Sequence, residues 1–242
     1  MKGIMWGAVT ETGLVRTKNE DYLRVNPAIR LFAVADGMGG HRAGEIASRL
    51  ALQVLEKELL ERIGRGEDVA ASFAGAVQEA NSRVWAEAQA NPDCQGMGTT
   101  LSACLLQGGR VFLAHVGDSR IYRVRNGIIE QLTEDHSLVH ELAKQGRLED
   151  DNAQASPLRN VLTRALGTEE SLSVDLQTRS LRMGDRLVLC TDGLTNLVTN
   201  DEILETVGAT ADPSTAARQL AEKAIARGGT DNITLIVVVI EE

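Results

Sequence analysis

Two short glycine-containing connections constrain the fold of this chain more than any other feature of its sequence. Gly108-Gly109 lies between the apolar runs Thr99 to Leu106 and Arg110 to Val116, and Asn126-Gly127 follows the run Ile121 to Val124. Two-residue loops of this composition are typical of tight hairpins between antiparallel strands. A doubly wound parallel sheet is therefore disfavoured.

The apolar runs indicate how the sheets are covered. The run Val111 to Val116 scarcely alternates between apolar and polar residues, which is typical of a strand buried on both faces. Similar runs occur at Leu31 to Ala35, Arg186 to Cys190 and Ile233 to Ile240. An antiparallel sheet buried on both sides can pack on a second sheet and under helices at the same time.

Helical periodicity provides the covering layers. Apolar residues repeat at helical spacing along rows that begin at Ile46 and Ala47 and end near Leu59, and again from Val69 to Val84. A third helix is expected near Pro213 to Arg227. The sequence therefore predicts an α+β fold, a four-layer α-β-β-α sandwich of two antiparallel sheets flanked by helices.

The charge balance and the cysteines exclude several classes of protein. The 242 residues include 25 Lys and Arg against 34 Asp and Glu, a formal net charge of −9. Nucleic-acid-binding proteins normally carry a basic surface instead. Cys94, Cys104 and Cys190 are too few and too dispersed for a disulfide framework or a zinc motif. We expect no nucleic-acid partner and a reducing, cytoplasmic location.

Membrane insertion is also not expected. The first residues contain no apolar segment of signal-peptide length. The longest strongly apolar run, Ile233 to Ile240, is far shorter than the roughly 20 residues that cross a bilayer. The sequence therefore predicts a protein that has no membrane partner.

Acidic residues recur at the ends of the predicted strands. Their positions are Glu20 and Asp21 at the start of the segment that ends at Val25, Asp36 and Asp192 directly before glycines, Asp118 after Val116-Gly117, and Asp231 before Asn232. Each one alone is ordinary turn chemistry. If these strand ends meet at one edge of the sandwich, the carboxylates repel each other unless cations neutralise them. A pair of divalent cations is the economical neutraliser.

The donor atoms favour one class of metal and of reaction. All candidate ligands are oxygens and no His/Cys set has zinc spacing, which favours Mg²⁺ or Mn²⁺. Metal pairs held by carboxylates are typical of phosphate-ester hydrolysis, because they acidify a bridging water and stabilise the attacking and leaving oxygens. Arg16, close to Glu20, adds a planar cation that can bind a phosphate through two hydrogen bonds.

Short motifs around these residues form one ordered set. They are G-L-V-R-T-K-N-E-D at Gly13 to Asp21, V-A-D-G-M-G-G-H at Val34 to His41, G-T-T at Gly98 to Thr100, H-V-G-D-S-R at His115 to Arg120, T-D-G at Thr191 to Gly193, and G-G-T-D-N at Gly228 to Asn232. Together they resemble the metal-dependent type-2C (PPM) serine/threonine protein phosphatases in their compact bacterial form. The motifs span nearly the whole chain, so a single phosphatase domain is expected over residues 1–242.

The resemblance implies a metal-binding role for five of the matched positions. Asp36 would bridge two metals. Glu20 and the carbonyl of Gly37 would complete the shell of one metal, and Asp192 and Asp231 that of the other. The implied cofactor is Mn²⁺ or Mg²⁺, with two ions in the core of the site.

Other matched positions would act on water, phosphate and the leaving group. Asp21 would orient water, Arg16 would hold the substrate phosphate, and Asp118 would help to bind a third, weaker metal. The implied reaction is direct attack of a metal-bridging hydroxide on phosphoserine or phosphothreonine. His41 is a candidate general acid, because this chain has Met38 where many relatives have histidine. The alternative is that His41 caps a helix or is merely exposed.

The polar, turn-rich stretch Lys144 to Leu158 opens a region, about residues 144–170, with two interpretations. It is either a flap beside the site or a surface connection. The family resemblance further implies phosphorylated proteins as substrates and a companion serine/threonine kinase, and we expect a monomer.

Two alternatives remain for the function. One is a catalytically silent binding module, which has no chemical need for the whole set of Arg16, Glu20, Asp36, Asp192 and Asp231. The other is a two-metal nuclease, which fits the carboxylates but not the acidic chain.

Overall fold

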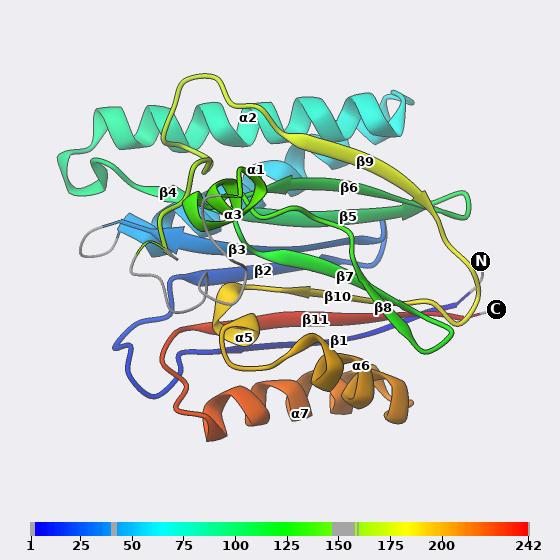
Figure 1. Cartoon of the computed structure of the whole chain (residues 1–242). Helices are drawn as coiled ribbons and strands as arrows, with labels where there is room; N and C mark the ends of the chain where they lie inside the picture. The colour runs from blue at the N-terminus through cyan, green and yellow to red at the C-terminus, as the bar shows by residue number, and fades with distance from the viewer. Residues whose placement is uncertain (1–2, 40–42, 147–157, 159, 242) are drawn as a thin grey trace.

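The computed structural model describes residues 3–39, 43–146, 158 and 160–241. Two stacked sheets lie between two layers of helices (Figure 1). One sheet has the strand order β2 (Asp21–Asn26), β3 (Leu31–Met38), β5 (Leu101–Gln107), β6 (Arg110–Val116) and β9 (Asp175–Ser180), with the short β4 (Gly98–Thr99) paired to β3. The other has the order β1 (Ile4–Glu11), β11 (Ile233–Ile240), β10 (Arg186–Cys190), β7 (Arg120–Arg125) and β8 (Ile128–Gln131). All the described strand pairings are antiparallel.

Helices cover the outer face of each sheet. The helices α1 (Ala43–Gly64) and α2 (Val69–Ala90) lie over the sheet that contains β3, and Figure 1 shows them on the opposite side of the molecule from α7 (Pro213–Ala226). The second sheet is covered by α7 together with α5 (Asp192–Thr195) and α6 (Asn200–Ala209). The short helix α3 (Leu138–Lys144) and the 3₁₀ turn η1 (Pro92–Cys94) lie in connections. The predicted α-β-β-α sandwich is confirmed.

Strand β3 shows why the apolar runs lack alternation. Leu31, Ala33 and Ala35 belong to the apolar cluster beneath α1 and α2. Phe32 and Val34 belong to the cluster between the two sheets. Successive side chains of a strand point to opposite faces, so β3 contributes to two apolar layers and is buried on both sides, as the sequence predicts.

Both predicted hairpins are present. Gln107 pairs with Arg110 across Gly108-Gly109, whose φ values are 58° and 76°. Arg125 pairs with Ile128 across Asn126-Gly127, whose φ values are 52° and 74°. Positive φ at both central residues is the backbone of a type I′ turn, which matches the twist of antiparallel strands.

The helices follow the predicted periodicity with one difference. The row Ala47, Ala51, Leu55 and Leu59 is buried in α1, whereas Ile46 remains 38% exposed. The predicted row that begins at Ile46 therefore lies at the margin of the packed face rather than within it. In the described ranges, no helix combines the length and the apolar character needed to cross a membrane.

The sequence patterns do not predict strands β1 and β9. Both lie at the edge of a sheet, where each pairs with a single neighbour, β11 and β6 respectively. Most residues of β9 (D-L-Q-T-R-S) are exposed. Strand β1 (I-M-W-G-A-V-T-E) is apolar but leaves Met5 and Trp6 exposed, so neither strand has the continuous burial of the central strands.

Candidate active site

A cleft of about 240 Å³ gathers most of the predicted site residues. Its lining includes Arg16, Glu20, Asp36, Gly37, Asp118, Asp192 and Asp231. Asp21 lies directly behind this lining, opposite Asp36 in the register of β2 and β3. His41 lies outside the described residues, so its predicted role stays a prediction.

Strand register explains why distant acids meet here. Asp21 pairs with Asp36 where β2 begins and β3 approaches its end. Asp192 follows the end of β10, and Asp231 precedes the start of β11, which is the neighbouring antiparallel strand. The end of one antiparallel strand lies beside the start of the next, so both acids are brought to the same edge of the second sheet.

Two glycines permit backbones to approach closely at this edge. A Cβ atom on Gly37 would lie 2.0 Å from the carbonyl oxygen of Gly44 at the start of α1. A Cβ atom on Gly193 would lie 1.9 Å from the carbonyl oxygen of Asn232. Both glycines follow a site aspartate, Asp36 and Asp192. The Asp-Gly pairs therefore serve close packing of the site as well as ordinary turn geometry.

Burial and mutual repulsion raise the pKa values of the site carboxyls. Asp36, Asp118 and Asp192 open partly onto the cleft but are otherwise surrounded by protein. Burial first, and then the charges of Asp21 and Asp192, raise the pKa of Asp36 well above its usual range. Burial, followed by the charge of Asp192, raises the pKa of Asp118 to about 7. Each carboxylate is costly to ionise here without a compensating cation.

Arg16 lies at the rim of the cleft, with its side chain half exposed. Its Nη2 donates a hydrogen bond of 2.8 Å to Asp231 Oδ2. This hydrogen bond and the charge of Asp231 raise the pKa of the Arg16 guanidinium. A planar cation beside buried carboxylates is suited to bind an anionic group that enters the cleft.

The donor set fits divalent cations that prefer oxygen. Asp21 Oδ1 and Asp192 Oδ1 are buried and lack a hydrogen-bond partner, although most buried polar atoms have one. No His or Cys from the described ranges lines the cleft. Among the described residues, no three His, Cys, Asp or Glu side chains are gathered tightly enough to surround one ion. An ion here would also use water or backbone oxygens, as Mg²⁺ commonly does.

Several supporting residues have no assigned role in the sequence reasoning, although all lie within the quoted motifs. Asn232 Oδ1 accepts a hydrogen bond from Glu20 N (2.8 Å), and its Nδ2 donates to the carbonyls of Thr12 and Lys18. Asn232 therefore holds the loop that carries Arg16. Thr191 Oγ1 donates to Asp21 Oδ2 (2.8 Å), which orients that buried carboxyl.

The predicted flap region is described only in part, because residues 147–157 and 159 lie outside the described ranges. Asn160 and Leu162 line the cleft. Leu162 also forms an isolated β-bridge with Ser137, directly before α3. This part of the region therefore borders the site, and its further role stays a prediction.

Comparison with known proteins identifies the family. A family model described as Protein phosphatase 2C matches residues 5–233. The chain belongs to the protein phosphatase 2C family. The family resemblance of the sequence motifs is thus confirmed.

Members of this family from several bacteria are similar along the chain. The serine/threonine protein phosphatase PstP of Mycobacterium tuberculosis is 41% identical over 234 residues, which are 97% of this chain and 44% of PstP. The serine/threonine phosphatase stp of Listeria monocytogenes is 40% identical over 236 residues, covering 95% of this chain and 93% of stp. The chain thus spans less than half of the first relative and nearly all of the second.

Solved structures of phosphatase 2C relatives share the fold. The crystal structure of Mycobacterium tuberculosis PstP superposes with a TM-score of 0.92 at 39% identity, covering 99% of both chains. The catalytic domain of PstP in complex with two manganese ions gives a TM-score of 0.89 at 38% identity, again over 99% of both chains.

The raised pKa values predict that the metal-free phosphatase 2C domain loses stability as pH rises. Burial raises the pKa of Asp21 and of Asp118 from 3.8 to about 7. Between these values the folded state binds more protons than the unfolded state, so unfolding becomes easier as pH increases. Thermal melts in chelator should show Tm falling between pH 5 and pH 8, with Mn²⁺ restoring it at pH 8. A Tm that rises over this interval would contradict the prediction.

Proposed function

We propose that this chain is a metal-dependent protein serine/threonine phosphatase, which hydrolyses phosphoserine and phosphothreonine in phosphoproteins. The observation that carries the proposal is the gathering of buried carboxyls, with raised pKa values, beside Arg16 in one cleft. Ionising these neighbouring buried carboxyls is costly unless cations bind to them. The bound cations and Arg16 would together attract an anionic substrate. The family membership supports the same function.

The residues of the chain divide the work of the proposed reaction. Arg16 would hold the phosphate at the rim, which requires its guanidinium to share Asp231 with the incoming group or to leave it. Glu20, Asp36, the carbonyl of Gly37, Asp192 and Asp231 would hold two divalent cations. When bound, such a pair supplies acidified water and neutralises charge on the phosphate. Asp21, fixed by Thr191, would orient water from beneath Asp36.

The identity of the metal and a third metal site are proposed from the family resemblance. Mn²⁺ and Mg²⁺ are both suited to the oxygen donors, and a third ion would bind between Asp118 and Asp192. The mutual repulsion between these two carboxyls supports that third site. We further propose a single domain over residues 1–242, a cytoplasmic monomer, and a companion serine/threonine kinase that produces the substrates.

A metal-titrated phosphopeptide assay tests the proposed function. Purified protein should hydrolyse a phosphothreonine peptide in Mn²⁺ and lose this activity in excess chelator. Undiminished hydrolysis in chelator would refute metal dependence. Cleavage of DNA or RNA without phosphopeptide turnover would indicate a nuclease, and binding of metal without turnover of any phosphoester would indicate a silent binding module.

A further inference from the structure

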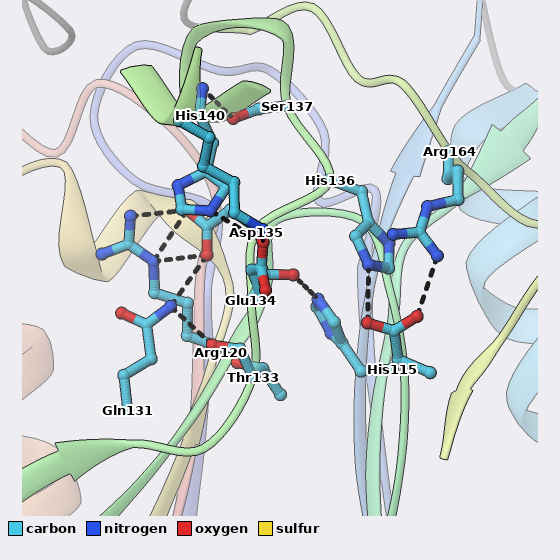
Figure 2. A network of polar contacts seen from close by, with 12 residues as sticks. His115, Arg120, Gln131, Thr133, Glu134, Asp135, His136, Ser137, His140 and Arg164 are labelled. Carbon is cyan, nitrogen blue, oxygen red and sulfur yellow. Dashed lines mark hydrogen bonds and ion pairs between the residues drawn. The ribbon is translucent and has the colours of Figure 1, made fainter. Parts of the chain in front are cut away.

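His136 belongs to the group of polar residues drawn in Figure 2, and its side chain is 2% exposed. The backbone N–H of His136 donates to the carbonyl of Gly117 (2.7 Å). In return, the N–H of Gly117 donates to Nδ1 of the His136 ring (3.1 Å). Both polar groups of the Gly117 backbone are thus bound to one histidine. Gly117 directly precedes Asp118, which lines the cleft.

The same histidine also contacts the described part of the flap region. The carbonyl of His136 accepts a hydrogen bond from Thr163 N (2.9 Å), and Leu138 N donates to the carbonyl of Val161 (2.8 Å). Between these two bonds lies Leu162, which lines the cleft. We refer to residues 161–163 as the flap base. His136 therefore joins the Gly117–Asp118 loop to the flap base.

Hydrogen bonding fixes the tautomer of the His136 ring. Its Nδ1 accepts from Gly117, so the ring proton lies on Nε2, which donates to Asp175 Oδ2 (3.2 Å). The other oxygen of Asp175 accepts from Arg164 Nη1 (2.9 Å), just beyond the flap base. Burial lowers the pKa of His136, which favours the neutral ring that this arrangement requires. Figure 2 shows Arg164 and His136 approaching the same carboxylate.

The position of Gly117 makes this restraint consequential for Asp118. Gly117 has φ of 102°, and a Cβ atom there would lie 2.6 Å from Cγ2 of Thr100. Its backbone occupies a conformation that side chains rarely adopt, within a packed environment. The ring Nδ1 of His136 holds the Val116–Gly117 peptide and its backbone N–H holds the Gly117–Asp118 peptide, so His136 restrains the chain on both sides of Gly117, directly before Asp118.

We propose that His136 is a positioning residue that holds Asp118 and the flap base as one unit at the cleft. The consequence for ion binding rests on the proposed phosphatase function, whereas the hydrogen-bond geometry of His136 does not. The ring acts through Gly117 and the backbone acts through Thr163. Loss of the Nδ1 acceptor would therefore loosen Gly117, next to Asp118, and weaken ion binding at Asp118, while the two-ion core is disturbed less.

Two substitutions separate the two ring nitrogens. In His136→Asn the amide oxygen takes the place of Nδ1 and can still accept from Gly117. In His136→Gln the longer amide reaches toward Asp175 and leaves the Gly117 N–H without its acceptor. Supporting residues around metal sites contribute about 10- to 100-fold to metal affinity. We expect His136→Gln to weaken the weakest Mn²⁺-binding step by that factor and His136→Asn to change it by less than about threefold.

Amide hydrogen exchange supplies a readout that needs no substrate. In metal-free protein, exchange at Gly117 should accelerate by about tenfold or more in His136→Gln and remain near wild type in His136→Asn. Calorimetry should report Mn²⁺ binding in the same proteins. His140→Gln is the matched control, because His140 is 38% exposed and its ring bonds only to Glu134 in the described structure. Its exchange and Mn²⁺ binding should match the wild type.

Asp175→Ala provides a second route if the ring variants do not fold. This substitution removes the carboxylate that accepts a hydrogen bond from Nε2 of His136. The Asp175 side chain is 32% exposed, and its loss should accelerate amide exchange at Gly117, as His136→Gln does. Equal effects of His136→Asn and His136→Gln, or unchanged exchange at Gly117 in His136→Gln, would overturn the proposal. Absence of phosphopeptide turnover in the wild type, with the expected exchange pattern, would refute the phosphatase function and leave the positioning role supported.

Discussion

Asp36→Asn should abolish phosphatase activity while making the metal-free protein more stable at neutral pH. Asp36 lies among the carboxyl groups that line the cleft, and its pKa is raised by burial and by the charges of Asp21 and Asp192. The asparagine amide keeps the shape but removes the charge, so the repulsion that opposes folding falls. The same change removes the proposed bridging ligand, and activity should fall by at least about 10²-fold, the scale of losing one preorganised electrostatic contact.

Opposite changes in activity and stability make this result specific. Phosphopeptide turnover in Mn²⁺ and urea unfolding in chelator should be measured on the same preparations. Asp68→Asn is the control, because Asp68 caps the start of α2 and asparagine caps equally well. It should leave both quantities near wild type. If Asp36→Asn retained activity, or lost it together with stability in chelator, the proposed role of Asp36 would be wrong.

Gly193→Ala should destabilise the protein by about 3 kcal/mol or more, the upper range for inserting a carbon into a packed site. The new Cβ would lie 1.9 Å from the carbonyl oxygen of Asn232, which is backbone and cannot move aside without displacing Asp231. Because Asp192 and Asp231 would separate, Mn²⁺ binding should weaken as well. Both effects arise from one contact between the start of α5 and the start of β11.

A second glycine offers a matched comparison for this substitution. Gly208 lies inside α6, and a Cβ atom there would meet nothing within 4 Å. Gly208→Ala should therefore raise the free energy of unfolding by about 0.5–1 kcal/mol, because alanine is the better helix former. Urea unfolding of both variants measures the contrast. A Gly193→Ala protein as stable as the wild type would show that the close approach at this edge carries no constraint.

Local sequence patterns predict much of the sandwich, because turns and strand burial are encoded by residues that are adjacent in the sequence. Positive-φ residues at Gly108-Gly109 and Asn126-Gly127 dictate the hairpins, and the continuous apolar character of β3 and β11 reports burial on both faces. The edge strands β1 and β9 are not predicted, although each pairs with one neighbouring strand. Strand β9 has few apolar residues, and β1 is apolar without a regular alternation, so neither local pattern identifies a strand.

The candidate site divides in a similar way. The acids at strand ends can be found in the sequence, because Asp36 and Asp192 each precede a glycine that the packing requires. Their supporting contacts cannot be found in this way. Asn232 bonds to residues more than two hundred positions away, and Thr191 reaches Asp21 from the other sheet.

The sequence by itself determined the antiparallel character of the sheets, the four layers, the family and the set of acids that could hold cations. Only the tertiary structure decided which strand ends share an edge, which carboxyls become hard to ionise, and that His136 joins Gly117 to the flap base. The reason is physical: turns and burial depend on adjacent residues, whereas a pKa or a buried hydrogen bond depends on groups that only the folded chain brings within reach.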